Sequence, residues 1–152
     1  MCFNPVISLT TFIIEISLAL IIYYLNKKSK LNQVGAIALI FLGLYQFSEF
    51  MVCKNISVNF WAKFGYIAAT FLPAIGLHLT YLITKRKIEY KYIYILPEIL
   101  AVIILFTDKI IKTAVCHKFF VEFLYESTIF SVLHTIYFIL YLILILIILI
   151  RK

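Results

Sequence analysis

Five acidic or imidazole side chains lie within long apolar stretches of this 152-residue chain. They are three glutamates and two histidines: Glu15, Glu49, Glu98, His78 and His134. A charged group at the centre of a membrane helix costs about 2.5 kcal/mol or more on insertion scales, so such residues are rare without a reason. Carboxylates and imidazoles bind ions, hold polar ligands and transfer protons. These five residues are therefore the first candidates for a functional site.

Their spacing places several of them on polar helix faces. Ser8 and Glu15 are seven residues apart, and Gln46, Glu49 and Cys53 follow each other at intervals of three and four residues. Residues at these intervals share one face of a helix. We therefore expect an inward-facing polar core, and its candidate members are Glu15, Gln46, Glu49, His78, Glu98 and His134.

This polar core has two interpretations. Buried hydrogen bonds can simply hold membrane helices together, because lipid provides no hydrophobic force between them. Alternatively, the core binds a small ligand or an ion. A metal site would use Glu49, His134 and Cys53, although neither His-x-x-x-His nor Cys-x-x-Cys spacing is present. No cofactor is predicted.

The chain has three cysteines, Cys2, Cys53 and Cys116, and the topology derived below puts all three on the outer side of the membrane. Disulfides persist in an oxidising compartment. Cys53 and Cys116 belong to different outer connections, so a disulfide between them would join the connections and leave Cys2 free or metal-bound beside His117. Three reduced thiols are the alternative.

The composition excludes a soluble domain. Hydrophobic residues make up 64% of the chain and charged residues only 14%, whereas ordinary globular chains are about half apolar and about a quarter charged. A membrane-spanning helix needs about 20 apolar residues. Five stretches meet or approach this length, and they predict an all-α, polytopic transmembrane helical bundle that forms one domain, with spans at about 6–25, 34–52, 59–84, 92–107 and 129–150.

The longest connection, residues 108–128, contains an apolar segment with one acid. Residues 119–124, Phe-Phe-Val-Glu-Phe-Leu, are expected to form an amphipathic helix at the membrane surface.

Lysine and arginine set the expected orientation, since cytoplasmic loops carry an excess of both. Along an alternating five-span path, nine of the 14 basic residues fall on one side and five on the other. The side with nine is assigned to the cytoplasm. The protein is then expected in the plasma membrane, with its amino terminus outside the cell and its carboxyl terminus in the cytoplasm. The charges form no single large patch, so nucleic acid is not an expected partner.

The amino-terminal third resembles an uncharacterised prokaryotic multi-pass membrane family. The likeness is carried by Met1-Cys2-Phe3-Asn4-Pro5 and by Leu44-Tyr45-Gln46-Phe47-Ser48-Glu49. Members of that family open with Met-Cys-Phe-Ser and have Gln-x-x-Glu on the second helix. The chain departs from the family at Asn4 and near Cys53. The resemblance implies that Cys2, Gln46 and Glu49 act together near the outer surface.

A second resemblance concerns the segments Phe60-Trp61-Ala62-Lys63-Phe64-Gly65-Tyr66 and His78-Leu79-Thr80-Tyr81. They are similar to the third helix of the seven-helix membrane sensor region of some histidine kinases. This likeness implies a sensor-like membrane module, here with five expected spans.

No catalytic motif accompanies the polar core, so a non-enzymatic role is preferred. The leading hypothesis is a sensory module, or one that binds a small ligand or ion, whose partners are the lipid bilayer and either further copies of itself or a separate membrane or signalling protein. One alternative is an intramembrane metal-dependent hydrolase that uses a metal-bound water. The other is a small transporter or channel built from oligomers.

Overall fold

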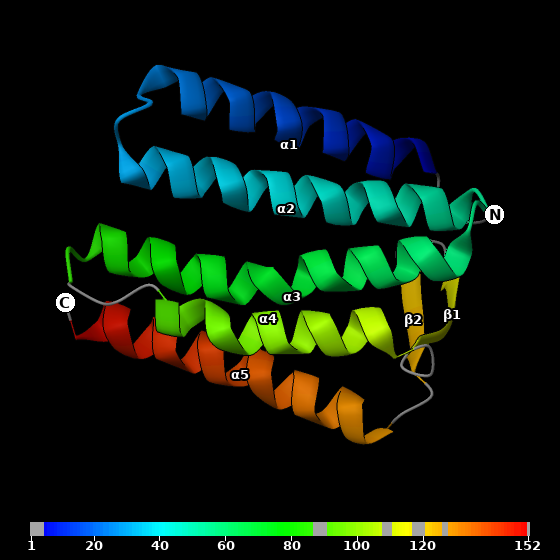
Figure 1. Ribbon diagram of the computed structural model, residues 1–152. Coiled ribbons are helices and arrows are strands. Elements are labelled where there is room, and N and C mark those ends of the chain that lie inside the picture. Colours follow the sequence, from blue (N-terminus) through cyan, green and yellow to red (C-terminus); the bar gives the residue numbers. More distant parts are fainter. Residues whose placement is uncertain (1–4, 87–90, 108–110, 117–120, 126–127, 152) are drawn as a thin grey trace.

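The computed structural model describes residues 5–86, 91–107, 111–116, 121–125 and 128–151. Within these residues the fold is a bundle of five helices and one short β-hairpin (Figure 1). The elements are α1 Pro5–Leu25, α2 Lys30–Cys53, α3 Val58–Ile83, α4 Lys91–Phe106, β1 Ile111–Cys116, β2 Val121–Tyr125 and α5 Thr128–Ile150. The expected all-α bundle is thus confirmed in outline, with a small hairpin added.

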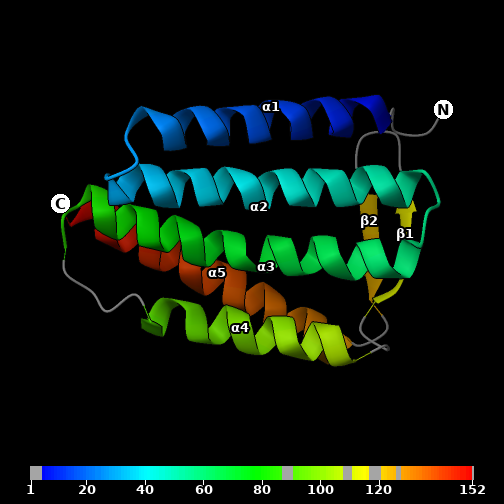
Figure 2. The same ribbon diagram turned by 45° about the horizontal axis from the view of Figure 1, so that its top comes forward.

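Successive helices run in opposite directions along the bundle (Figures 1 and 2). Residues 26–29 turn the chain between α1 and α2, and the Ser29 hydroxyl caps α2 by accepting from the backbone N–H of Asn32 at 3.4 Å. The Asn32 side chain in turn donates to the carbonyl oxygen of Ile22 at 3.2 Å. The bond from Asn32 to Ile22 ties the end of α1 to the start of α2.

Four helices, α1, α2, α3 and α5, are long and apolar enough to cross a membrane. Their lengths range from 21 to 26 residues. Large apolar side chains cover the outside of α1 and α5, as expected of surfaces that face lipid. Together these features indicate a membrane protein. The fourth expected span corresponds to α4, which has only 16 residues and is about 24 Å long.

Helix α3 is the centre of the bundle because it contacts α2, α4 and α5. Small residues on its buried side, including Ala62, Gly65 and Ala68, let neighbouring helices approach closely. Tyr66 of α3 and Tyr137 of α5 are part of the apolar cluster that fills the space between α3, α4, α5 and the hairpin.

The hairpin replaces the amphipathic helix expected at residues 119–124. Residues 121–125 form strand β2, which pairs antiparallel with β1, while residues 119 and 120 lie outside the described residues. Val121 is buried and Glu122 is exposed, as expected of neighbouring residues on opposite faces of a strand. The helical prediction was wrong because pairing with β1, itself anchored at Cys116, decides the conformation of this short segment.

Candidate functional site

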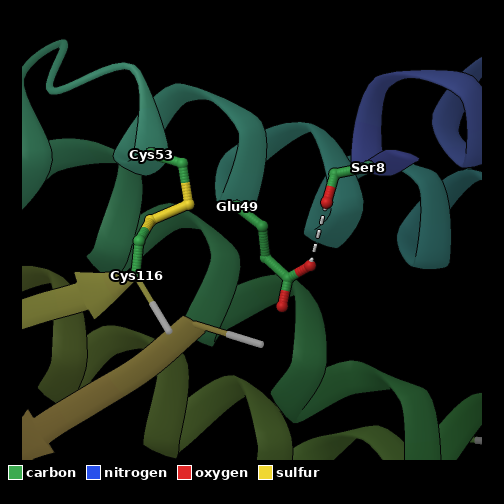
Figure 3. The surroundings of a disulfide bond; sticks show 4 residues. All are labelled: Ser8, Glu49, Cys53 and Cys116. Atoms are coloured by element: carbon green, nitrogen blue, oxygen red, sulfur yellow. Dashed lines mark hydrogen bonds between the residues drawn. A yellow bond between two sulfur atoms is a disulfide. The ribbon is translucent and has the colours of Figure 1, made fainter. Parts of the chain in front are cut away.

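The carboxyl-terminal half of α2 carries a buried polar contact with α1. Glu49 is only 6% exposed, and its Oε2 accepts a hydrogen bond from the Ser8 hydroxyl of α1 at 3.4 Å (Figure 3). The Tyr45 side chain, one turn away on α2, also hydrogen-bonds to this carboxyl. Ser8 itself is completely buried. The polar stripes expected on α1 and α2 therefore meet at this point.

A disulfide bond joins Cys53 to Cys116, one helical turn beyond Glu49 (Figure 3). The two Cα atoms are 5.7 Å apart, and the bond fastens the end of α2 to strand β1. Of the two redox states left open by the sequence, the structure contains the disulfide. Cys53 and Cys116 are thus not free thiols, and Cys2 lies outside the described residues.

The disulfide also removes Cys53 from the set of metal ligands expected from the sequence. Cys53 was a candidate ligand together with Glu49 and His134, but its sulfur is bonded to Cys116. Glu49 contacts Ser8 of α1, whereas His134 contacts Thr70 of α3, so the remaining two candidates serve different helix pairs. Across the described ranges, no three residues of His, Cys, Asp or Glu are grouped so as to hold a metal.

Two further members of the expected core lie on the α1–α2 pair. Gln46 is half-buried and precedes Glu49 by three residues, so both lie on one side of α2. Glu15 is 8% exposed, and its Oε2 is buried with no hydrogen-bond partner among the described residues. The sequence correctly predicted that Glu15 faces inward.

His134 belongs to a separate polar contact between α3 and α5. Its Nε2 lies 3.0 Å from the Thr70 hydroxyl, which also bonds to the Tyr66 carbonyl oxygen at 2.8 Å. The Thr70 hydroxyl has one hydrogen, which it donates to the Tyr66 carbonyl oxygen. In the second bond the imidazole is therefore the donor, through a hydrogen on Nε2, and the hydroxyl oxygen accepts. The rings of Tyr66 and Phe138 lie 4.4 and 4.9 Å from the imidazole, centroid to centroid. This geometry holds the imidazole in place and suits a structural role.

His78 and Glu98 lie nearer the other end of the bundle, and only His78 faces a neighbouring helix. Its Nδ1 is 3.0 Å from the Tyr94 hydroxyl, which links α3 to α4. Glu98 is exposed, in contrast to the inward position expected for it. The buried residues of α4 are Ile93, Pro97, Leu100 and Ile104. Their spacing of three and four defines the inner face, and Glu98 falls beside that face.

One contact that we did not predict involves Pro97. Proline has no N–H, so the carbonyl oxygen of the residue four positions earlier, Ile93, loses its normal helical partner. The Tyr141 hydroxyl of α5 donates to that oxygen at 2.7 Å. The sequence does contain the signal that a carbonyl is available, but it does not identify the side chain on another helix that uses it.

No family model, curated protein or solved structure matches the chain. The two family resemblances noted for the sequence therefore remain predictions.

Proposed function

We propose that the protein is a multi-pass protein of the plasma membrane that senses a small ligand or ion at Glu49 and acts through a membrane or signalling partner. The observation that carries the proposal is the buried Glu49 carboxyl, held between α1 and α2 by the Ser8 hydroxyl. A carboxyl at this position is costly unless it has a purpose.

Five crossings, with the amino terminus outside, are supported by the alternating direction of the helices. At one end, the α1–α2 turn carries Lys27 and Lys28, and Arg86 and Arg151 lie at the ends of α3 and α5. The disulfide lies at the opposite end. Basic residues favour the cytoplasm and disulfides favour an oxidising compartment, so two independent tendencies agree on the orientation.

The Ser8–Glu49 hydrogen bond is one that a bound ligand could replace. At 3.4 Å it is longer than the usual 2.5–3.0 Å of hydroxyl–oxygen bonds. A cation or a ligand with an N–H or O–H donor can offer this carboxyl a shorter, charge-assisted bond. Binding would then replace the contact that α1 makes with Glu49.

Replacing that contact would be felt mainly by α1, because α1 packs chiefly on α2. Its outer face bears large exposed apolar residues such as Ile13, Leu18 and Ile21. A shift of α1 therefore changes a surface that a partner's membrane helix can contact. The disulfide at Cys53 keeps α2 fixed to the hairpin, so the movement is directed to α1 rather than shared.

A thermal-unfolding series tests the proposal. The purified full chain is heated with Na⁺, K⁺, Ca²⁺, ammonium or methylammonium as separate probes. A probe at about a hundred times its Kd adds about 2.7 kcal/mol to stability. We expect at least one probe to raise the unfolding midpoint of the wild type and of Glu98→Gln, which alters an exposed carboxyl.

The same probe should have no effect on Glu49→Gln, and Gln46→Ala should reduce its effect. The proposal fails if every probe shifts the wild type and Glu49→Gln equally, or if none shifts the wild type.

The orientation is tested separately by fusing a reporter that is fluorescent only in the cytoplasm to the carboxyl terminus. Fluorescent cells are expected, and dark cells with full-length fusion in the membrane fraction would reverse the orientation.

A further inference from the structure

A groove with a volume of about 610 Å³ opens between α1 and α2. It extends from Ile16 to Tyr23 along α1 and from Ile40 back to Gln33 along α2. This volume lies within the range of small-molecule sites, about 300–1,000 Å³. The groove is separate from Glu49, which lies nearer the other end of α2.

Two small side chains leave space in the groove, and close contacts limit it at both ends. Ala19 and Ala36 line it and are 2% and 4% exposed, so they leave space where larger residues would fill it. Toward the bundle centre, the helices close together at Gly43, where the side chains of Phe12 and Ile16 pack. Toward the turn, the Asn32–Ile22 hydrogen bond joins the helices again.

The position of the groove matches one leaflet of a bilayer. Ile16 and Tyr23 are seven residues apart, which corresponds to about 10 Å along a helix. One leaflet of the hydrocarbon core is about 15 Å thick. The groove begins beside the α1–α2 turn and ends near the middle of the helices, so an acyl chain that enters at the membrane surface can lie along it.

The surface end of the groove is strongly basic. Gln33, a lining residue, donates through Nε2 to the carbonyl oxygen of Lys27 at 2.7 Å, which brings the lysine-bearing turn against the groove. Lys27, Lys28 and Lys30 are all exposed there. The sequence contains no acidic residue between Glu15 and Glu49. The turn therefore places three exposed lysines at this end of the groove.

From this combination we propose that the α1–α2 groove is a binding site for an anionic phospholipid of the surrounding bilayer. One acyl chain lies between α1 and α2, and the phosphate-bearing headgroup contacts the lysines of the turn. Basic pockets between membrane helices recognise lipid headgroups in this way. The site needs only that the helices lie in a bilayer, so it does not depend on ligand binding at Glu49.

Native mass spectrometry of the delipidated full chain tests the proposal. Phosphatidylglycerol and phosphatidylcholine with identical acyl chains are titrated separately in neutral detergent. We expect one phosphatidylglycerol to bind per chain, more tightly than phosphatidylcholine. Each lysine near the surface contributes about 1 kcal/mol, or about a fivefold factor, so the triple variant Lys27→Gln, Lys28→Gln, Lys30→Gln should weaken phosphatidylglycerol binding about a hundredfold.

A matched triple variant provides the charge control. Lys85→Gln, Lys91→Gln and Arg151→Gln remove three exposed charges from the same end of the bundle, away from the groove. This variant should keep the tight binding of phosphatidylglycerol. An equal loss in both triple variants would overturn the proposal, because it would show only a general attraction to positive charge.

Filling the groove provides the second arm. Leu20→Trp with Ile37→Trp places bulk on two partly exposed lining residues, and it should weaken both lipids. Leu142→Trp with Leu146→Trp makes the same change on the exposed face of α5 and should weaken neither. The proposal is also overturned if both lipids bind the wild type equally, if the filled groove binds as before, or if a second copy of the chain occupies it as a dimer.

Discussion

The Tyr141 hydroxyl donates a hydrogen bond to the backbone carbonyl oxygen of Ile93, 2.7 Å away, and so links α5 to α4. The acceptor is available because Pro97 lacks the N–H that would normally bond to it. Tyr141 is 6% exposed and Ile93 is 4% exposed, so the bond is buried within the bundle. A kink-forming proline and a tyrosine on another helix thus act as one connection.

Removing that hydroxyl should destabilise the bundle. We expect Tyr141→Phe to lower the free energy of unfolding by about 1 kcal/mol, the scale measured for single hydrogen bonds in membrane proteins. In a Pro97→Ala background, the alanine supplies the missing N–H and the loss should shrink. Unfolding by SDS titration in mixed micelles measures all four members of this double-mutant cycle.

Tyr137→Phe is the control for the cycle. Tyr137 donates to the carbonyl oxygen of Thr70 at 2.7 Å, and Ala74, four residues later, still has its own N–H. The cost of Tyr137→Phe should therefore be the same whether proline or alanine occupies position 97. If Tyr141→Phe is equally insensitive to residue 97, the account of Pro97 is wrong.

The sequence predicted the bundle well because membrane insertion depends on local composition. Four of the expected spans correspond to helices long and apolar enough to cross a membrane. Basic residues also mark the ends of α1, α3 and α5. The hairpin escaped prediction because its strand β2 depends on pairing with β1, which helical amphipathicity in residues 119–124 does not reveal.

For the candidate site, the spacing of the polar residues predicted that several of their side chains face inward, but not which groups those side chains contact. Ser8, Glu15 and Glu49 are buried as their shared faces predicted. Glu98 is not, because the inner face of α4 is defined by the packing of Pro97 and its neighbours. Periodicity identifies one face of a helix, whereas the partner of each polar group depends on the rotation of the helices against each other.

The disulfide makes a prediction about thiol reactivity. Without reduction, an alkylating reagent should modify only Cys2 in the denatured full chain, because Cys53 and Cys116 are bonded to each other. Reduction should expose two more sites, which intact-mass measurement counts. A Cys2→Ser variant should then take up no reagent before reduction, and modification of all three cysteines without reduction would contradict the structure.

Loss of the disulfide should also reduce stability. It closes a loop with a sequence separation of 63 residues, for which the chain-entropy model gives up to about 4 kcal/mol. We expect the double variant Cys53→Ser, Cys116→Ser to insert in the membrane and to unfold at a lower SDS fraction. Cys2→Ser should unfold like the wild type.

The hydrogen bond between Thr70 and His134 gives a further prediction. Thr70→Val keeps the shape of the side chain but leaves Nε2 of the buried imidazole without its partner. A loss of about 1–2 kcal/mol is expected, and Thr70→Ser should recover most of it. Thr135→Val is the matched control, since Thr135 is exposed and its hydroxyl donates only to Ser131 in its own helix. Equal effects of the two valine variants in SDS titrations would refute a special role for Thr70.

The close contact at Gly43 should decide whether α1 stays docked. A Cβ atom at Gly43 would lie 3.2 Å from Cδ1 of Ile16 and 3.3 Å from Cδ2 of Phe12, whereas a Cβ at Gly35 would meet nothing within 4 Å. Gly43→Leu therefore forces α1 away and should cost about 1–3 kcal/mol, the usual range for overpacking. Gly35→Leu should cost little.

Displacement of α1 would also separate Ser8 from Glu49, so the two glycines connect stability to the proposed function. We expect Gly43→Leu to unfold earlier in SDS and to show a changed response to any probe that shifts the wild type, while Gly35→Leu keeps both properties. Equal behaviour of the two leucine variants would mean that α1 is not held by the close approach at Gly43. A normal probe response in a destabilised Gly43→Leu would mean that sensing does not pass through the Ser8 contact.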